Sequence, residues 1–141
     1  MTRIDFYILS DADPMARYRV ACRIAEKAWG TGHRVHIHTD SPQESRKMDQ
    51  LLWTFRDRSF VPHAVEPENA GEFPVTIGHS PAPDTRQVLI NLAAEVPVFF
   101  EQFERVAEIV ARNRESSDKD RERYRFYRDR DCKLNHHHLD S

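Results

Sequence analysis

The stretch RIDFYILSDADPMARYRVACRIAEKAWGTGHRVHIH, residues 3–38, decides the fold because it encodes a strand, a helix and a second strand in succession. Residues 3–9 form a β-branched and aromatic run that is typical of a strand. Pro14 suits the first position of a helix, and Gly30 suits its end. Residues 34–38 then predict the second strand. This order predicts parallel strands joined by a right-handed helical crossover.

Similar signals continue along the chain. Residues 41–44, Ser-Pro-Gln-Glu, combine a cap, a first-turn proline and a capping-box glutamate, so they predict a second helix that runs to about Trp53. Residues 59–63 predict a short extended piece at a sheet edge, because their proline lacks a ladder donor. Residues 75–77 and 88–92 predict two more strands.

Two sets of apolar residues at helical spacing mark buried faces. In the first helix, Cys22 lies on such a stripe, and we expect it to be a small core residue. Farther along, a stripe at positions i, i+4, i+7 and i+11 predicts a third helix packed on the sheet. This stripe consists of Phe99, Phe103, Val106 and Val110.

Alternating strands and helices predict an α/β fold: a single Rossmann-like, open and mainly parallel sheet of about four or five strands, flanked by helices on both faces. The 141 residues suit one domain covering 1–141. The four glycines form neither GxGxxG nor GxxxxGK[ST], so we expect no nucleotide-binding loop.

Composition excludes several classes of protein. The net charge of −2 is not that of a chain that lives on nucleic acid. The two cysteines lack the spacing of a disulfide framework or a zinc knuckle. No apolar window is long enough for a membrane span, and the first residues do not resemble a signal peptide. We therefore expect a cytoplasmic protein with reduced thiols, no membrane association and no cofactor.

The predicted last helix, at about 117–130, carries the strongest candidate site. Arg121, Tyr124, Arg125 and Arg128 share one face at positions i, i+3, i+4 and i+7. Guanidinium groups beside an aromatic ring suit a short acidic peptide that ends in a hydrophobic residue and a free carboxylate. The alternative is a solvated charged face held by pairs within the helix. We expect residues 131–141 to form a flexible tail without a role.

The second candidate site is His36-Ile37-His38, because alternate strand residues point to one side and two imidazoles can bind a metal. A metal-dependent hydrolase that uses His36 and His38 is therefore an alternative function. No HExxH motif or second carboxylate-rich motif accompanies them, which favours hydrogen-bonded strand histidines.

The third candidate is an aromatic block formed by Trp53, Phe60, Val61 and Pro62. These residues either fill the core or form an exposed anchor for another protein, since aromatic residues dominate interface hot spots.

Four segments together resemble one family, the chi subunit of the bacterial DNA polymerase III holoenzyme. They are residues 5–9, residues 28–35, the block from Leu52 to His63, and the helix Arg-Glu-Arg-Tyr-Arg-Phe-Tyr-Arg at 121–128. The resemblance implies a non-catalytic adaptor of the replication machinery with a Rossmann-like fold and no working nucleotide site. No enzymatic activity is expected of it.

The resemblance also implies partners. Arg121 and Tyr124, with Val110 as an apolar wall, fall where the family holds the acidic C-terminal tail of the single-stranded-DNA-binding protein, which ends in Pro-Phe. Trp53, Phe60 and Pro62 fall in the segment that meets the psi subunit, which ties the family to the clamp loader. A repair helicase that competes for the same face is a further partner to consider.

A direct nucleic-acid binder that uses the basic terminal helix is the other alternative, and the net charge argues against it. No sequence-specific contact with nucleic acid is expected. The family context implies a bacterial cytoplasmic protein associated with the replisome at the nucleoid.

Overall fold

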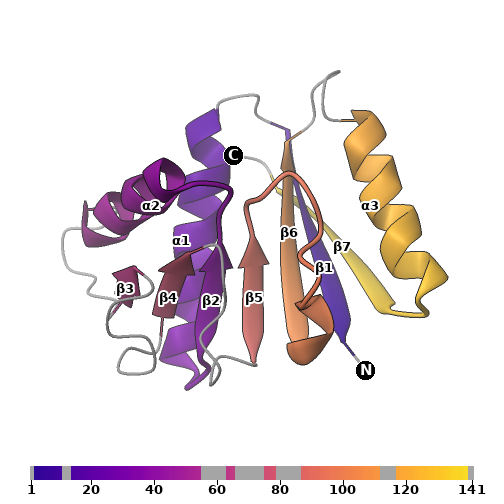
Figure 1. The fold of residues 1–141 in the computed structure, drawn as a ribbon, viewed down its shortest axis with the longest axis horizontal. Coiled ribbons are helices and arrows are strands. Elements are labelled where there is room, and N and C mark those ends of the chain that lie inside the picture. Colours follow the sequence, from indigo (N-terminus) through magenta and orange to yellow (C-terminus); the bar gives the residue numbers. More distant parts are fainter. Residues whose placement is uncertain are drawn as a thin grey trace.

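A computed structural model describes residues 2–10, 14–54, 63–65, 75–78, 87–111 and 117–139. Within them, strands and helices alternate along most of the chain (Figure 1). The elements are β1 (Arg3–Leu9), α1 (Pro14–Gly30), β2 (Val35–His38), α2 (Pro42–Thr54), β3 (His63–Val65), β4 (Val75–Gly78), β5 (Val88–Asn91), a 3-10 turn η1 (Phe100–Gln102), β6 (Arg105–Ala111), α3 (Ser117–Asp129) and β7 (Lys133–Leu139).

The described strands form one seven-stranded sheet in the order β3-β4-β2-β5-β6-β1-β7. Every neighbouring pair in it is parallel. The expected open α/β sheet is thus confirmed, whereas the expected number of four or five strands is too low. The additional strands are β6 and β7, which lie on either side of β1.

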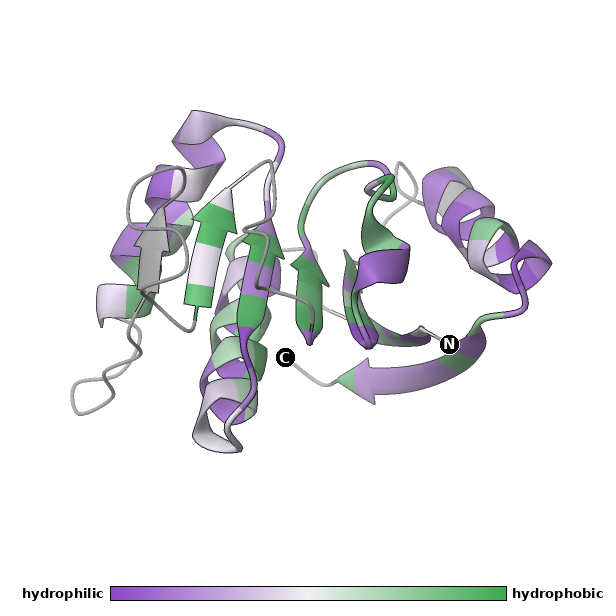
Figure 2. Ribbon diagram, turned by 60° about the horizontal axis from the view of Figure 1, so that its bottom comes forward, coloured by the Kyte–Doolittle hydropathy of each residue, from purple (hydrophilic) through white to green (hydrophobic). Residues whose placement is uncertain are grey.

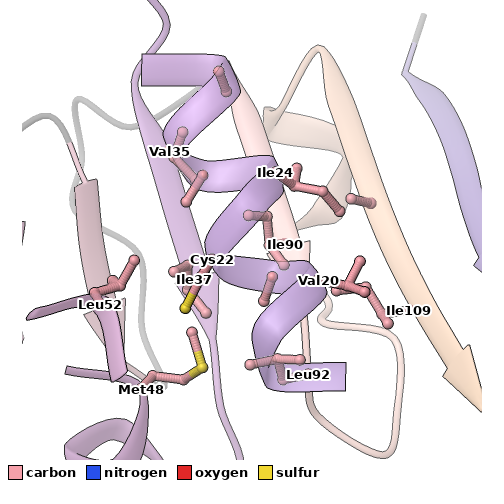
Figure 3. Close-up of a cluster of buried hydrophobic side chains, with 14 of the residues drawn as sticks. Val20, Cys22, Ile24, Val35, Ile37, Met48, Leu52, Ile90, Leu92 and Ile109 are labelled. Atoms are coloured by element: carbon pink, nitrogen blue, oxygen red, sulfur yellow. The ribbon is translucent and has the colours of Figure 1, made fainter. Parts of the chain in front are cut away.

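Each face of the sheet has its own apolar core. On one face, α1 and α2 pack on the sheet, and Figure 3 shows side chains such as Val20 and Met48 meeting Ile37 and Ile90 there. Cys22 is wholly buried in this cluster, as expected. The opposite face carries a second cluster that includes Tyr127 of α3. Helices therefore flank both faces, and none of the described helices is long and apolar enough to cross a membrane.

The sequence signals at the helix ends are confirmed. α1 begins at Pro14 and ends at Gly30, after which Gly32 adopts a φ of 86°, where a residue without Cβ is favoured. At the start of α2, the Ser41 hydroxyl oxygen accepts a hydrogen bond of 3.1 Å from the backbone N–H of Glu44. The carboxylate of Glu44 in turn accepts one of 3.0 Å from the backbone N–H of Asp40.

The prediction of a helix from the stripe between Phe99 and Val110 is wrong. The stripe begins around the short turn η1 and continues as strand β6. A spacing of four residues places Val106 and Val110 on one side of a strand as well as of a helix. Ala107 and Ile109, between them, are also buried, because β6 is covered on both faces. The pattern of one buried helical face therefore does not apply to this segment.

The flexible tail expected over 131–141 is also wrong, because residues 133–139 form β7. This strand runs parallel to β1 with Phe6 opposite His136. Asp131 makes the turn from α3 into β7 with a φ of 58°, which aspartate tolerates better than most residues. The polar composition of β7 concealed it, since an edge strand does not need an apolar face along its whole length.

Candidate peptide-binding site

A pocket of about 250 Å³ lies where the sheet changes its direction of winding. β1 and β6 are parallel neighbours. β1 leads to α1 on one face of the sheet, whereas β6 leads to α3 on the other face (Figure 1). Open parallel sheets bind their ligands beside the carboxyl ends of strands at such a point. The pocket is lined by Phe6 and Ile8 of β1, Val110 of β6, Asp120, Arg121, Tyr124, Arg125 and Arg128 of α3, and His136 of β7.

All five residues that the sequence assigns to a peptide site line this one pocket, namely Val110, Arg121, Tyr124, Arg125 and Arg128. Val110 contributes from the end of strand β6 and not from a helix. The sequence reasoning missed Phe6, Ile8 and His136, because they lie on strands whose pairing is visible only in the folded sheet, and it did not assign Asp120 of α3 to the site.

Three rings form the apolar part of the pocket. Phe6 is almost fully buried, at 4% exposure, and its ring stacks on His136 with centroids 5.3 Å apart. Tyr124, which is 37% exposed, lies 6.2 Å from Phe6 and 5.6 Å from His136 between ring centroids. Tilted and offset rings of this kind provide surfaces on which an apolar side chain can pack.

The charged part of the pocket comes from α3, which is largely hydrophilic along its length (Figure 2). Arg121, Arg125 and Arg128 are exposed to solvent, and Asp120 is the only carboxylate among the described residues that line the pocket. The pocket therefore has an excess of positive charge. Guanidinium groups bind carboxylates through paired, charge-assisted hydrogen bonds. The arrangement suits a ligand that combines a carboxylate with an apolar side chain.

A buried polar network fixes α3 against the sheet. Glu108 of β6 is wholly buried and receives an ion pair of 3.1 Å from Arg123. The Tyr127 hydroxyl donates to the same carboxylate at 2.5 Å, and the Asn91 side-chain amide donates at 3.0 Å. Arg123 also donates to the carbonyl of Ala94 at 2.5 Å. Arg123 and Tyr127, on the inner side of α3, thus fix the helix in the position in which its outer side lines the pocket.

Burial raises the pKa of the Glu108 carboxyl, and Arg123 with the hydrogen bonds from Tyr127 and Asn91 opposes part of that rise. Burial also raises the pKa of Tyr127, reinforced by the neighbouring Glu108. Tyr127 therefore stays a protonated donor, and the network depends on donors that converge on one buried acceptor.

Comparison with known proteins identifies the family. The family model for the DNA polymerase III chi subunit, HolC, matches residues 1–135. This chain belongs to that family. The DNA polymerase III subunit chi of Pseudomonas aeruginosa is 43% identical over 140 residues, which cover 99% of this chain and 98% of the relative. The Haemophilus influenzae subunit chi is 31% identical, covering 87% and 88%, and the Escherichia coli one is 30% identical, covering 91% and 92%.

Membership in the chi family confirms the resemblance drawn from four sequence segments and extends it over residues 1–135. Most of the pocket lies within the matched residues, whereas His136 follows directly after them. That side of the pocket could not be inferred from the family pattern.

The two strand histidines of this chi-family chain lie on one face, as their spacing predicts, but inside the core. His36 is wholly buried, and its Nδ1 lies 2.8 Å from the Thr76 hydroxyl oxygen. The His38 ring packs edge-on against Phe99, with centroids 5.1 Å apart. Within the described part of the chain, no three His, Cys, Asp or Glu side chains are grouped to hold a metal ion. The geometry favours a hydrogen-bonded core histidine at His36 and a ring-packed, half-buried one at His38.

Buried His36 makes the stability of the domain depend on pH. Burial lowers the pKa of His36 to about 3. The unfolded chain therefore binds this proton below about pH 6.5 while the folded chain does not, so stability falls as the pH drops. Between pH 7 and 5.5, we expect His36 to lower the free energy of unfolding by about 1 kcal/mol.

Urea unfolding of the wild type and His36→Gln at both pH values measures this effect. The glutamine variant should lose less stability on acidification than the wild type. Equal losses in the two proteins would show that His36 is not the titrating group.

The aromatic block is only partly described. Trp53 lies in the last turn of α2 and is 51% exposed, unlike its neighbour Leu52, which is buried. It is therefore not a filler of the core, and the anchor interpretation fits it better. Phe60, Val61 and Pro62 lie outside the described residues.

Proposed function

We propose that this chain is a non-catalytic adaptor of bacterial DNA replication, an accessory subunit of the DNA polymerase III holoenzyme. In this proposal, the α3 pocket binds the acidic C-terminal tail of the single-stranded-DNA-binding protein, and the Trp53 region binds the psi subunit and, through it, the clamp loader. The observation that carries the proposal is the meeting of three arginines with three rings in one pocket. Chi-family membership supports the assignment to replication.

The two parts of the pocket match the two parts of such a tail. A terminal phenylalanine side chain enters between Phe6, Tyr124 and His136, where apolar surface is available. Its α-carboxylate and the preceding acidic residues pair with the guanidinium groups of Arg121, Arg125 and Arg128. Salt screens the exposed ion pairs, whereas burial of the ring depends little on salt. Binding should therefore weaken with salt without disappearing.

A fluorescence-anisotropy titration tests the pocket. The probe is a labelled acidic peptide that ends in Asp-Phe-Pro-Phe, and the control is the same peptide without the final phenylalanine. Saturable binding of the first peptide alone supports the proposal. Equal binding of both peptides would mean that charge alone attracts them, and absence of binding would remove the pocket as a tail site.

On the opposite flank, Trp53→Ala should weaken the association with psi by removing an exposed aromatic contact. Aromatic anchors of this kind contribute about 2 kcal/mol or more to an interface when truncated. Gel filtration of the mixed subunits and a calorimetric titration measure the loss. Gln50→Ala, an exposed change on the same helix, is the control. An unaltered heterodimer in the Trp53 variant would place the psi interface elsewhere.

The proposal locates the protein in the bacterial cytoplasm, at the replisome. A repair helicase that uses the Trp53 face would compete with psi for it, and the same Trp53 variant would then lose both partners.

A further inference from the structure

A second and larger pocket, of about 520 Å³, lies on the α1 face of the sheet, opposite to α3. On this face, β1 and β7 form a strip at the sheet edge, beside β6. The pocket lies between α1 and this strip. Its lining comes from α1 and the turn that follows it, from β1, β5 and β6, and from the end of β7.

Two walls of this pocket are cationic. Arg23 and Lys27 lie one turn apart on the exposed side of α1. Across the pocket, Arg3 and Arg105 stand side by side on paired strands. Among the lining residues that the structure describes, Glu104 is the only carboxylate. The pocket is therefore positive within a chain whose net charge is −2.

A buried carboxylate positions the wall that Arg3 and Arg105 form. Asp5, which is 2% exposed, lies 2.6 Å from Arg105 Nε and 3.3 Å from an Arg3 guanidinium nitrogen. Burial of Asp5 would raise its pKa, but the hydrogen bond and charge of Arg105 outweigh burial and keep the pKa below its ordinary value. The ionised carboxylate thus holds both guanidinium groups in place before any ligand arrives.

Between the walls, the floor of the pocket is apolar. It is formed by Val20, Ile24, Ala28 and Val88, all of them buried. The ring of Tyr7 lies beside it and stacks on His137, with centroids 4.9 Å apart. Side chains with hydrogen-bonding groups, such as Gln87 and His33, also line the pocket.

We propose that this pocket binds single-stranded nucleic acid without sequence preference. The phosphates pair with the cations of both walls, while a base packs on the apolar floor beside Tyr7. Proteins that hold single strands combine a basic groove with surfaces on which bases stack. An acidic peptide would use the cations but not the apolar floor beside Tyr7. Because the α3 pocket lies on the other face, this binding is independent of the peptide and compatible with it.

Fluorescence anisotropy with a labelled oligodeoxythymidylate of about 15 nucleotides tests the proposal at low salt. The full chain should bind it saturably. The double variant Arg23→Gln, Lys27→Gln should bind about tenfold more weakly, with a salt slope smaller by roughly 1.4, because each phosphate contact to a single strand contributes about 0.7. The control is Arg46→Gln, Lys47→Gln, which removes two exposed charges from α2 outside the pocket and should bind as the wild type does.

Several results would overturn the proposal. One is the absence of saturable binding at low salt, and another is an equal loss in the α2 control, which would indicate general electrostatic attraction. A loss of binding confined to an Arg121→Gln, Arg125→Gln variant would place the oligonucleotide on α3. More effective competition by polyglutamate than by unlabelled oligonucleotide would indicate an acidic protein ligand. Binding of the acidic tail peptide should persist in the Arg23→Gln, Lys27→Gln variant, so this proposal and the peptide proposal can fail separately.

Discussion

Replacement of Glu108 by alanine is expected to lower the free energy of unfolding by about 3–5 kcal/mol, because removal of one partner leaves the other as an uncompensated buried charge. Arg123 would lose its 3.1 Å ion pair, and the hydroxyl of Tyr127 would lose its acceptor. Domains of this size have total stabilities of about 5–15 kcal/mol, so the loss is a large fraction of the whole. Urea unfolding followed by circular dichroism measures it.

The same helix supplies a matched control. Arg128 and Asp129 form an ion pair of 3.4 Å whose side chains are 57% and 65% exposed. Exposed pairs contribute about 0–1 kcal/mol, so Asp129→Ala should change stability little. Comparable losses in the two variants would show that burial of the Glu108 network is not what makes it stabilising. Should Glu108→Ala fail to fold, Glu108→Gln can be measured in its place. Its side chain retains a hydrogen-bond acceptor, so the loss in the free energy of unfolding should be smaller and should come from the same buried network.

The second large effect concerns the peptide. Arg121→Ala should weaken binding of the acidic tail peptide by roughly tenfold to a hundredfold at low salt, because hydrogen bonds to charged groups contribute about 1.5–3 kcal/mol. Arg121 is exposed, so its removal should leave the fold unchanged. The anisotropy titration measures the loss, and the difference from the wild type should shrink as salt is added.

Arg46→Ala, at an exposed position on α2 that does not line the pocket, controls for net charge. Tyr124→Ala should also weaken binding of the acidic tail peptide, but by a factor that depends little on salt, because the change removes an apolar contact. An Arg121 variant with unchanged affinity at low salt would rule out the pocket as the carboxylate site.

The sequence alone was sufficient to predict the helices and strands that carry strong local signals. Pro14, Gly30 and the capping motif at 41–44 mark helix ends by chemistry that acts within a few residues, and these ends agree with the structure. β6 and β7 could not be found in this way. The valine spacing in β6 is shared by helices and strands, and Glu108 looks like a solvated residue until Arg123 and Tyr127 are placed against it.

The candidate site likewise contains residues that local sequence predicts and residues that only the folded sheet brings together. The face formed by Arg121, Tyr124, Arg125 and Arg128 follows from helix geometry alone. Phe6 and His136 stand far apart in the sequence, and only the pairing of β1 with β7 brings their rings into contact. Local patterns therefore predicted the charged side of the pocket and the Tyr124 ring, but not the two rings that the strands contribute.

The position of β1 between β6 and β7 has a consequence for biosynthesis. Arg3 pairs with Arg105 on one side and with Lys133 on the other, so the first strand made at the ribosome waits for the last two. Such distant pairings cost loop-closure entropy and slow folding. Until β6 emerges, the apolar residues of β1 have no neighbouring strand, and this nascent segment is the part of the chain most exposed to mispairing and to capture by chaperones.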